Sequence, residues 1–154
     1  MEQRKDGLFH TNWTGRFTPV CRKPLFIVDG AHNADAADKM AESIRHYFNG
    51  KKLIFIMGVF ADKEYDLVLE KTAHFAEKIY TIETPDNPRA LPAGELAKAA
   101  RVYNSSAEST KSITDAVEKA LAYAGDDENS VILAFGSLSF IGELTRVVEE
   151  KCEK

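Results

Sequence analysis

The stretch PLFIVDGAHNADAADKM, residues 24–40, decides the fold class of this chain. Its first half is a short apolar run that ends in Asp29 and Gly30, a pattern typical of a strand buried on both faces. From Ala37 to Tyr47, apolar residues then recur at the spacing of one helix face. The stretch therefore predicts a buried strand that passes into a helix through a tight polar turn.

The same alternation continues along the chain. Further apolar runs, rich in β-branched or aromatic residues, occupy 52–58, 78–84 and 130–136. Helical spacing of apolar residues recurs over 65–72, 93–103, 113–124 and 138–150. Each strand is thus followed by a helix that can return the chain to the same end of a sheet.

Strands that alternate with helices predict an α/β fold, because crossover helices place successive strands in parallel. We expect a three-layer, Rossmann-like domain with a mainly parallel sheet of about six strands. Two of these strands come from shorter segments. Residues 105–107 form one, and the Thr, Phe and Val content near 16–20 predicts an antiparallel strand at the edge.

Composition limits the classes of function. With 154 residues, 44% of them hydrophobic, we expect a single domain over 1–154 with its own core. A net charge of -4 with interspersed acids and bases argues against a dominant nucleic-acid surface. No apolar run approaches the ~20 residues of a membrane span, and the charged N-terminus does not resemble a signal peptide. Cys21 and Cys152 lie far apart, so we expect two reduced thiols in a cytoplasmic domain.

Four polar loops follow the predicted parallel strands. Ligands of open parallel sheets bind beyond the carboxyl ends of the strands. That rule selects DGAHN (29–33), GVFADKE (58–64), ETPDNPRALP (83–92) and GSLSF (136–140). We expect all four loops on one edge of the sheet.

The first of these loops allows two interpretations. Gly30 permits a tight turn, and His32 and Asn33 fall near a helix start, where backbone N–H groups favour a negatively charged ligand. Alternatively, Asp29 ties the turn and Asn33 caps the helix, while His32 has no role. The residues alone leave both interpretations open.

The other loops present the same choice. Asp62 is expected to be an N-cap, with Lys63 opening the helix. Ser137 or Ser139 either caps the last helix or helps its start to receive a carboxylate or phosphate. Arg89 either clamps a carboxylate or is solvated. Because the chain has no P-loop, no G-x-S-x-G motif and no Cys/His cluster, the residues predict an anion-binding edge without complete catalytic machinery.

Five motifs then stand in a recognisable order: NWTGRF (12–17), PLFIVDGAHN (24–33), GVFADKE (58–64), DNPRA (86–90) and FGSLSFIGEL (135–144). Together they resemble the C-terminal domain of the bacterial folylpolyglutamate synthase/dihydrofolate synthase family, a branch of the Mur ligase superfamily. The resemblance extends over residues 7–148.

The resemblance implies an ATP-dependent amide ligase. In that family ATP phosphorylates a folate carboxylate, and the amine of L-glutamate attacks the acyl phosphate. It also implies that an upstream P-loop domain, absent from this chain, holds the folate and most of the ATP and Mg²⁺ contacts. The chain alone is therefore expected to be inactive, without nucleic-acid or membrane partners.

The resemblance also implies roles for individual residues, according to their positions in the matching motifs. The resemblance implies that Arg16 and Asp29 contact ATP, and that His32 and Ser137 contact the incoming glutamate. The residues that would support these loops are Gly30, Asn33, Asp62, Lys63 and Arg89.

Two positions depart from the family pattern. Thr14 stands where the family usually has proline, and Ser139 stands where it often has tyrosine, which predicts the loss of the aromatic packing or hydroxyl expected there. Two alternatives remain: a Mur peptidoglycan ligase domain, whose DNPR motif matches 86–89, and a non-catalytic α/β nucleotide-binding module.

Overall fold

The computed structural model describes residues 18–31, 33–61 and 64–152 of the chain. Its strands are β1 (Thr18–Arg22), β2 (Leu25–Val28), β3 (Lys52–Met57), β4 (Lys78–Thr81), β5 (Ala107–Ser109) and β6 (Ser130–Phe135). Its helices are α2 (Ala34–Tyr47), α3 (Tyr65–Thr72), α4 (Ala93–Arg101), α5 (Ile113–Ala124) and α6 (Leu138–Lys151), with a 3₁₀ turn η2 (Ala73–Phe75).

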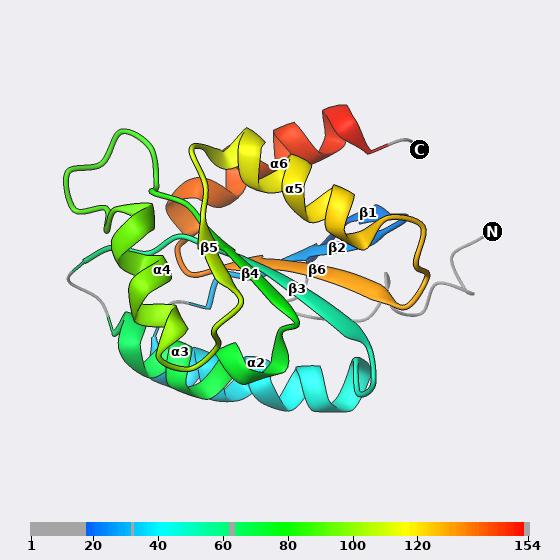
Figure 1. The fold of residues 1–154 in the computed structure, drawn as a ribbon, viewed down its shortest axis with the longest axis horizontal. Helices are drawn as coiled ribbons and strands as arrows, with labels where there is room; N and C mark the ends of the chain where they lie inside the picture. The colour runs from blue at the N-terminus through cyan, green and yellow to red at the C-terminus, as the bar shows by residue number, and fades with distance from the viewer. Residues whose placement is uncertain (1–17, 32, 62–63, 153–154) are drawn as a thin grey trace.

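The described strands form one sheet in the order β1-β2-β6-β3-β4-β5 (Figure 1). All neighbouring pairs are parallel except β1 and β2, which are antiparallel. The predicted α/β class, the mainly parallel sheet and the antiparallel edge strand are therefore confirmed. The longest ladder joins β3 to β6, from the pair Lys52↔Ser130 to the pair Met57↔Phe135.

Helices cover both faces of the sheet and create three layers (Figure 1). Helices α2, α3 and α4 lie on one face, and α5 and α6 lie on the other. Alternate strand residues enter the two resulting apolar layers: Phe55 and Met57 pack in the first, Ile54 and Ile56 in the second. This period of two over a fully buried strand explains why the sequence reads as a continuous apolar run.

The short strand predicted at 105–107 is displaced: β5 begins only at Ala107. The Asn104 side chain donates to the carbonyl oxygens of Ala73 and Ala76, each at 2.8 Å, and accepts from the Ser106 backbone N–H at 3.0 Å. These bonds hold the chain in a turn up to Ser106, so pairing with β4 starts later than the residue types indicate.

The prediction of two reduced thiols is wrong in this structure, where Cys21 and Cys152 form a disulfide. Their Cα atoms lie 6.2 Å apart although 131 positions separate them in the chain. The pairing arises because the end of α6 returns over the sheet face beside edge strand β1. No local spacing in the sequence reveals that meeting.

Among the described residues, no helix combines the length and the apolar character needed to cross a membrane.

A close backbone approach joins β3 and β6 where they leave the sheet. Gly136 has a φ of +120°, and a Cβ built there would overlap the carbonyl oxygen of Gly58 and come within 3.1 Å of the Val59 side chain. Only glycine combines this φ with this clearance. The first residues of the two neighbouring loops are thereby held in contact.

We predict that Gly136→Ala lowers the free energy of unfolding by at least about 2 kcal/mol, because it adds both backbone strain and overlap. Urea denaturation measures the loss. Gly142→Ala is the matched control, since a Cβ at this α6 position meets nothing within 4 Å. That variant should gain about 0.5–1 kcal/mol from helix propensity. Equal midpoints for the two variants would contradict the assigned role of Gly136.

Candidate functional site

The four polar loops lie at the carboxyl ends of β2, β3, β4 and β6, on the left in Figure 1. This is the edge predicted from the sequence. Backbone hydrogen bonds join the first loop to the last, because the Gly136 N–H donates to the Ala31 carbonyl at 3.0 Å. The second and third loops are joined by Ala61 N–H to the Arg89 carbonyl at 2.7 Å, and by Leu91 N–H to the Val59 carbonyl at 3.0 Å.

Asp29 forms the turn that follows β2. Its Oδ1 accepts from the Ala31 N–H at 2.8 Å, and its own N–H donates to the Ala134 carbonyl at 2.9 Å. The residue is only 2% exposed. The structure therefore shows the turn-tying role, and contact with ATP remains a prediction for this side chain. Gly30 lies within the same turn.

Asn33 is the N-cap of α2. Its Oδ1 accepts from the Ala36 N–H at 2.9 Å, and its backbone is extended, with φ -140° and ψ 174°. The capping interpretation of Asn33 is thus confirmed. The cap fixes the point at which the first loop becomes helix.

Glu64 connects the second loop to the first. Its Oε1 accepts from the Ala34 N–H at 2.9 Å, at the start of α2. Glu64 itself occupies the N-cap position of α3, without a capping side-chain bond, so the prediction that Asp62 is the N-cap is wrong. Sequence reasoning missed the Glu64 contact because it spans 30 positions and no local motif signals it.

Ser137 is the N-cap of α6, which confirms one of the two predicted capping residues. Its Oγ accepts from the Ser139 N–H at 3.2 Å and lies 2.9 Å from the Ser139 Oγ. Ser137 is 5% exposed, whereas Ser139 is exposed. Ser139 thus has a hydroxyl within hydrogen-bonding distance of Ser137, and the expected loss of what a tyrosine would contribute at this position stays a prediction.

Arg89 lies on the surface of the third loop. Its guanidinium carbon is 4.7 Å from the centre of the Phe60 ring, and the backbone N–H of Arg89 donates to Asn87 Oδ1 at 2.9 Å. Sequence reasoning missed Phe60, although an aromatic residue three positions after the end of β3 was a visible signal. The stacking gives the arginine a defined support. Whether it clamps a carboxylate stays a prediction.

The edge therefore brings together Asp29, Gly30, Asn33 and Ser137 around the Ala31–Gly136 bond, with Arg89 one loop further along. The remaining predicted site residues lie outside the described part of the chain: Arg16, His32, Asp62 and Lys63.

The described residues include no group of three or more His, Cys, Asp or Glu side chains that could hold a metal ion. Glu108, whose pKa is lowered chiefly by its hydrogen bond to Lys78, lies on β5 rather than at this edge. The edge thus presents backbone N–H groups, hydroxyls and a guanidinium, which suit anionic ligands.

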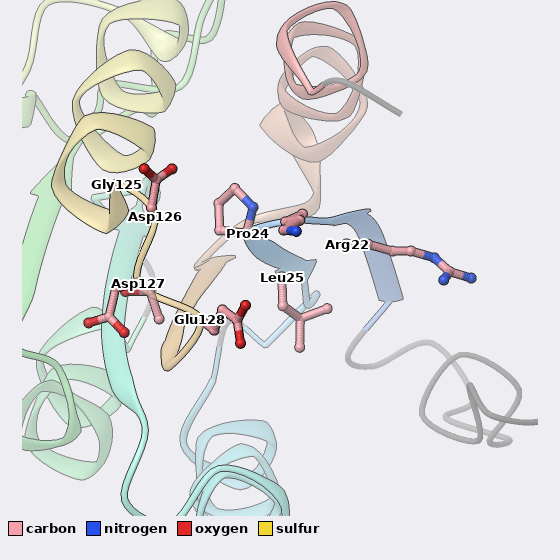
Figure 2. Close-up of a pocket in the computed structure, with 9 residues that line it drawn as sticks. Arg22, Pro24, Leu25, Gly125, Asp126, Asp127 and Glu128 are labelled. Carbon is pink, nitrogen blue, oxygen red and sulfur yellow. The ribbon is translucent and has the colours of Figure 1, made fainter.

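A cavity of about 610 Å³ lies at the opposite, amino end of the strands. Its lining includes Arg22 and Leu25 beside β2 and the acidic turn before β6, with Asp126, Asp127 and Glu128 (Figure 2). Asp127 already forms an ion pair with Lys52 at 3.7 Å. The cavity is separate from the four polar loops and is not the predicted site.

The fold and this edge define an α/β domain that gathers four polar loops, and its sequence contains no P-loop motif. The chain belongs to the Mur ligase, glutamate ligase domain family, whose model matches residues 15–138.

Relatives place the chain near the folate branch of that family. It is 27% identical over 146 residues to the dihydrofolate synthase/folylpolyglutamate synthase of Bacillus subtilis. The match covers 94% of this chain and 33% of that relative. The chain thus spans about a third of the length of that relative.

Solved structures share the fold. E. coli FolC in complex with DHPP and ADP matches with a TM-score of 0.78 at 23% identity, over 89% of this chain and 31% of that one. A bifunctional folylpolyglutamate synthase/dihydrofolate synthase with Mn, AMPPNP and L-glutamate bound matches with a TM-score of 0.72 at 24% identity, over 91% and 32%.

We predict that Asn33→Ala lowers the melting temperature by about 2–4 °C, since losing an N-cap costs about 1 kcal/mol in a domain of this size. Thermal denaturation followed by circular dichroism measures the shift. Asn33→Asp keeps a capping oxygen and is the control, with an expected shift near zero. An equal fall in both variants would show that the Ala36 bond is not the source of the stability.

Proposed function

We propose that this chain is the C-terminal domain of an ATP-dependent ligase that adds glutamate to folates. Such a ligase is a folylpolyglutamate synthase, and some enzymes of this kind are dihydrofolate synthases as well. The observation that carries this proposal is the joined edge: the Asp29 turn and the Ser137 cap meet through the bond from Gly136 N–H to the Ala31 carbonyl. Family membership supports the reaction class.

The geometry of the edge supports a division of roles. Helices α2 and α6 both begin there, and the positive ends of their dipoles favour negative charge on a ligand. In our proposal Ser137 and His32 contact the carboxylate or amine of the incoming glutamate. Arg16 and Asp29 contact ATP, with Asp29 also holding the turn. Gly30, Asn33 and Arg89 keep the loops in place.

The chemistry of the proposed reaction is acyl activation. ATP phosphorylates the folate carboxylate, and the glutamate amine then displaces phosphate to form the amide. This chain would orient the glutamate and close over the nucleotide. In keeping with the family resemblance, we place the Mg²⁺ ligands, with the P-loop and the folate site, in an upstream domain of such a ligase. A bifunctional folylpolyglutamate synthase/dihydrofolate synthase of similar fold has been solved with Mn, AMPPNP and L-glutamate bound, which are the classes of ligand that this proposal requires.

The proposal is tested by a fusion. The chain replaces the matching C-terminal third of the Bacillus subtilis relative, and ADP release is measured with ATP, L-glutamate and either dihydropteroate or a reduced folate. We expect turnover by the fusion and none by the chain alone. Comparing the two pterin substrates separates the two synthase activities.

Substitutions in the fusion test the residues. Asp29→Ala and His32→Ala should each lower kcat/KM by roughly tenfold to a hundredfold, the loss expected for a charged or polar contact in a closed site. Lys98→Ala, on the exposed side of α4, is the control and should leave kcat/KM unchanged. Turnover by the chain alone, or unchanged kinetics in both site variants, would overturn the proposal.

A further inference from the structure

The disulfide between Cys21 and Cys152 has no part in the proposed ligase chemistry. It joins edge strand β1 to the residue that ends α6, and it lies away from the four polar loops. A bond that connects two ends of a domain over 131 positions restrains the unfolded chain strongly. The question is what this bond controls.

Among the described residues, β1 is an edge strand that pairs with β2, and its register is irregular between Pro19 and Cys21. Proline has no backbone N–H to add to the ladder. Packing against α6 is a further restraint, since Cys21 shares an apolar layer with Val147 and Val148. The disulfide adds a covalent link to these non-covalent contacts of β1.

The two cysteines of the disulfide differ in their exposure to solvent. Cys21 is 5% exposed beneath α6, whereas Cys152 is half-buried and lies beyond the last residue of the helix. Its backbone N–H donates to the Val148 carbonyl at 2.7 Å, which is the last bond of the helical ladder. An incoming thiol therefore reaches Cys152 first, and Cys21 becomes the leaving thiolate.

We propose that Cys21–Cys152 is a reversible thiol–disulfide exchange site for low-molecular-weight thiols, and that it switches the local stability of β1 and the end of α6. A thiolate attacks the Cys152 sulfur, which breaks the Cys21–Cys152 bond, forms a mixed disulfide at Cys152 and releases the Cys21 thiolate. A second thiolate then removes the first as a small disulfide and leaves Cys152 reduced. Closure is the reverse exchange, with a small disulfide as the oxidant.

The first consequence is global. Opening a loop of this length should lower the melting temperature by roughly 10 °C. The wild-type chain is equilibrated with reduced or oxidised glutathione, its redox state is verified by mass, and its thermal denaturation is recorded. The Cys21→Ala/Cys152→Ala double variant is the control and should melt at one temperature in both buffers. A wild-type chain that melts equally in both verified states overturns the proposal.

The second consequence is local. Hydrogen exchange by NMR should show at least a tenfold loss of protection on reduction for the amide of Cys21, which stands opposite Phe26 in the β1–β2 pair. The amide of Ile54, in the doubly covered strand β3, should stay protected. If the Ile54 amide loses protection together with Cys21, the bond opens only by global unfolding and the switch is not local, which also overturns the proposal.

Single variants test the order of attack. Cys21→Ala leaves the accessible Cys152 thiol, and Cys152→Ala leaves the buried Cys21 thiol. In native buffer, 5,5′-dithiobis(2-nitrobenzoate) should modify the first variant at least tenfold faster than the second. Equal or reversed rates contradict attack at Cys152. None of these measurements depends on ligase activity, so the proposed function and this switch succeed or fail separately.

Discussion

The pairing of β3 with β6 is the constraint on which the rest of the structure depends. Both strands are covered by helices on both faces, so their backbone polar groups must pair with each other and with the strands alongside. The ladder brings the chains together up to their carboxyl ends, where Gly58 and Gly136 still touch. Two polar loops are consequently held side by side before any side chain contributes.

Local bonds then extend this contact into a continuous edge. The Ala31 carbonyl receives the Gly136 N–H, and Glu64 reaches across to the start of α2. Because backbone atoms make most of these contacts, the relative placement of the loops depends on the fold more than on any one polar side chain. A domain built in this way can present a preformed wall to a ligand, which is what the proposed ligase function requires.

Sequence reasoning succeeded where a pattern has a single structural meaning. Strands that are buried on both faces and helices that are buried on one face show different spacings of apolar residues along the chain. The placement of the four loops at one edge follows from the parallel sheet. It failed where the answer lay in contacts between distant segments. The late start of β5 depends on Asn104 bonding to Ala73 and Ala76, and the Glu64 side chain accepts from the Ala34 N–H at the start of α2. Each of these contacts joins segments that no local window contains.

By itself, the sequence determined the α/β class, the sheet edge that bears the polar loops and the family to which they are similar, because periodicity and motif order are local properties. Only the tertiary structure decided that Asp29 is buried, that Glu64 reaches Ala34, and that Cys21 meets Cys152. Those contacts depend on where the ends of the helices and strands lie relative to the sheet. Their positions are set by the packing of the whole chain, which residue spacing alone does not encode.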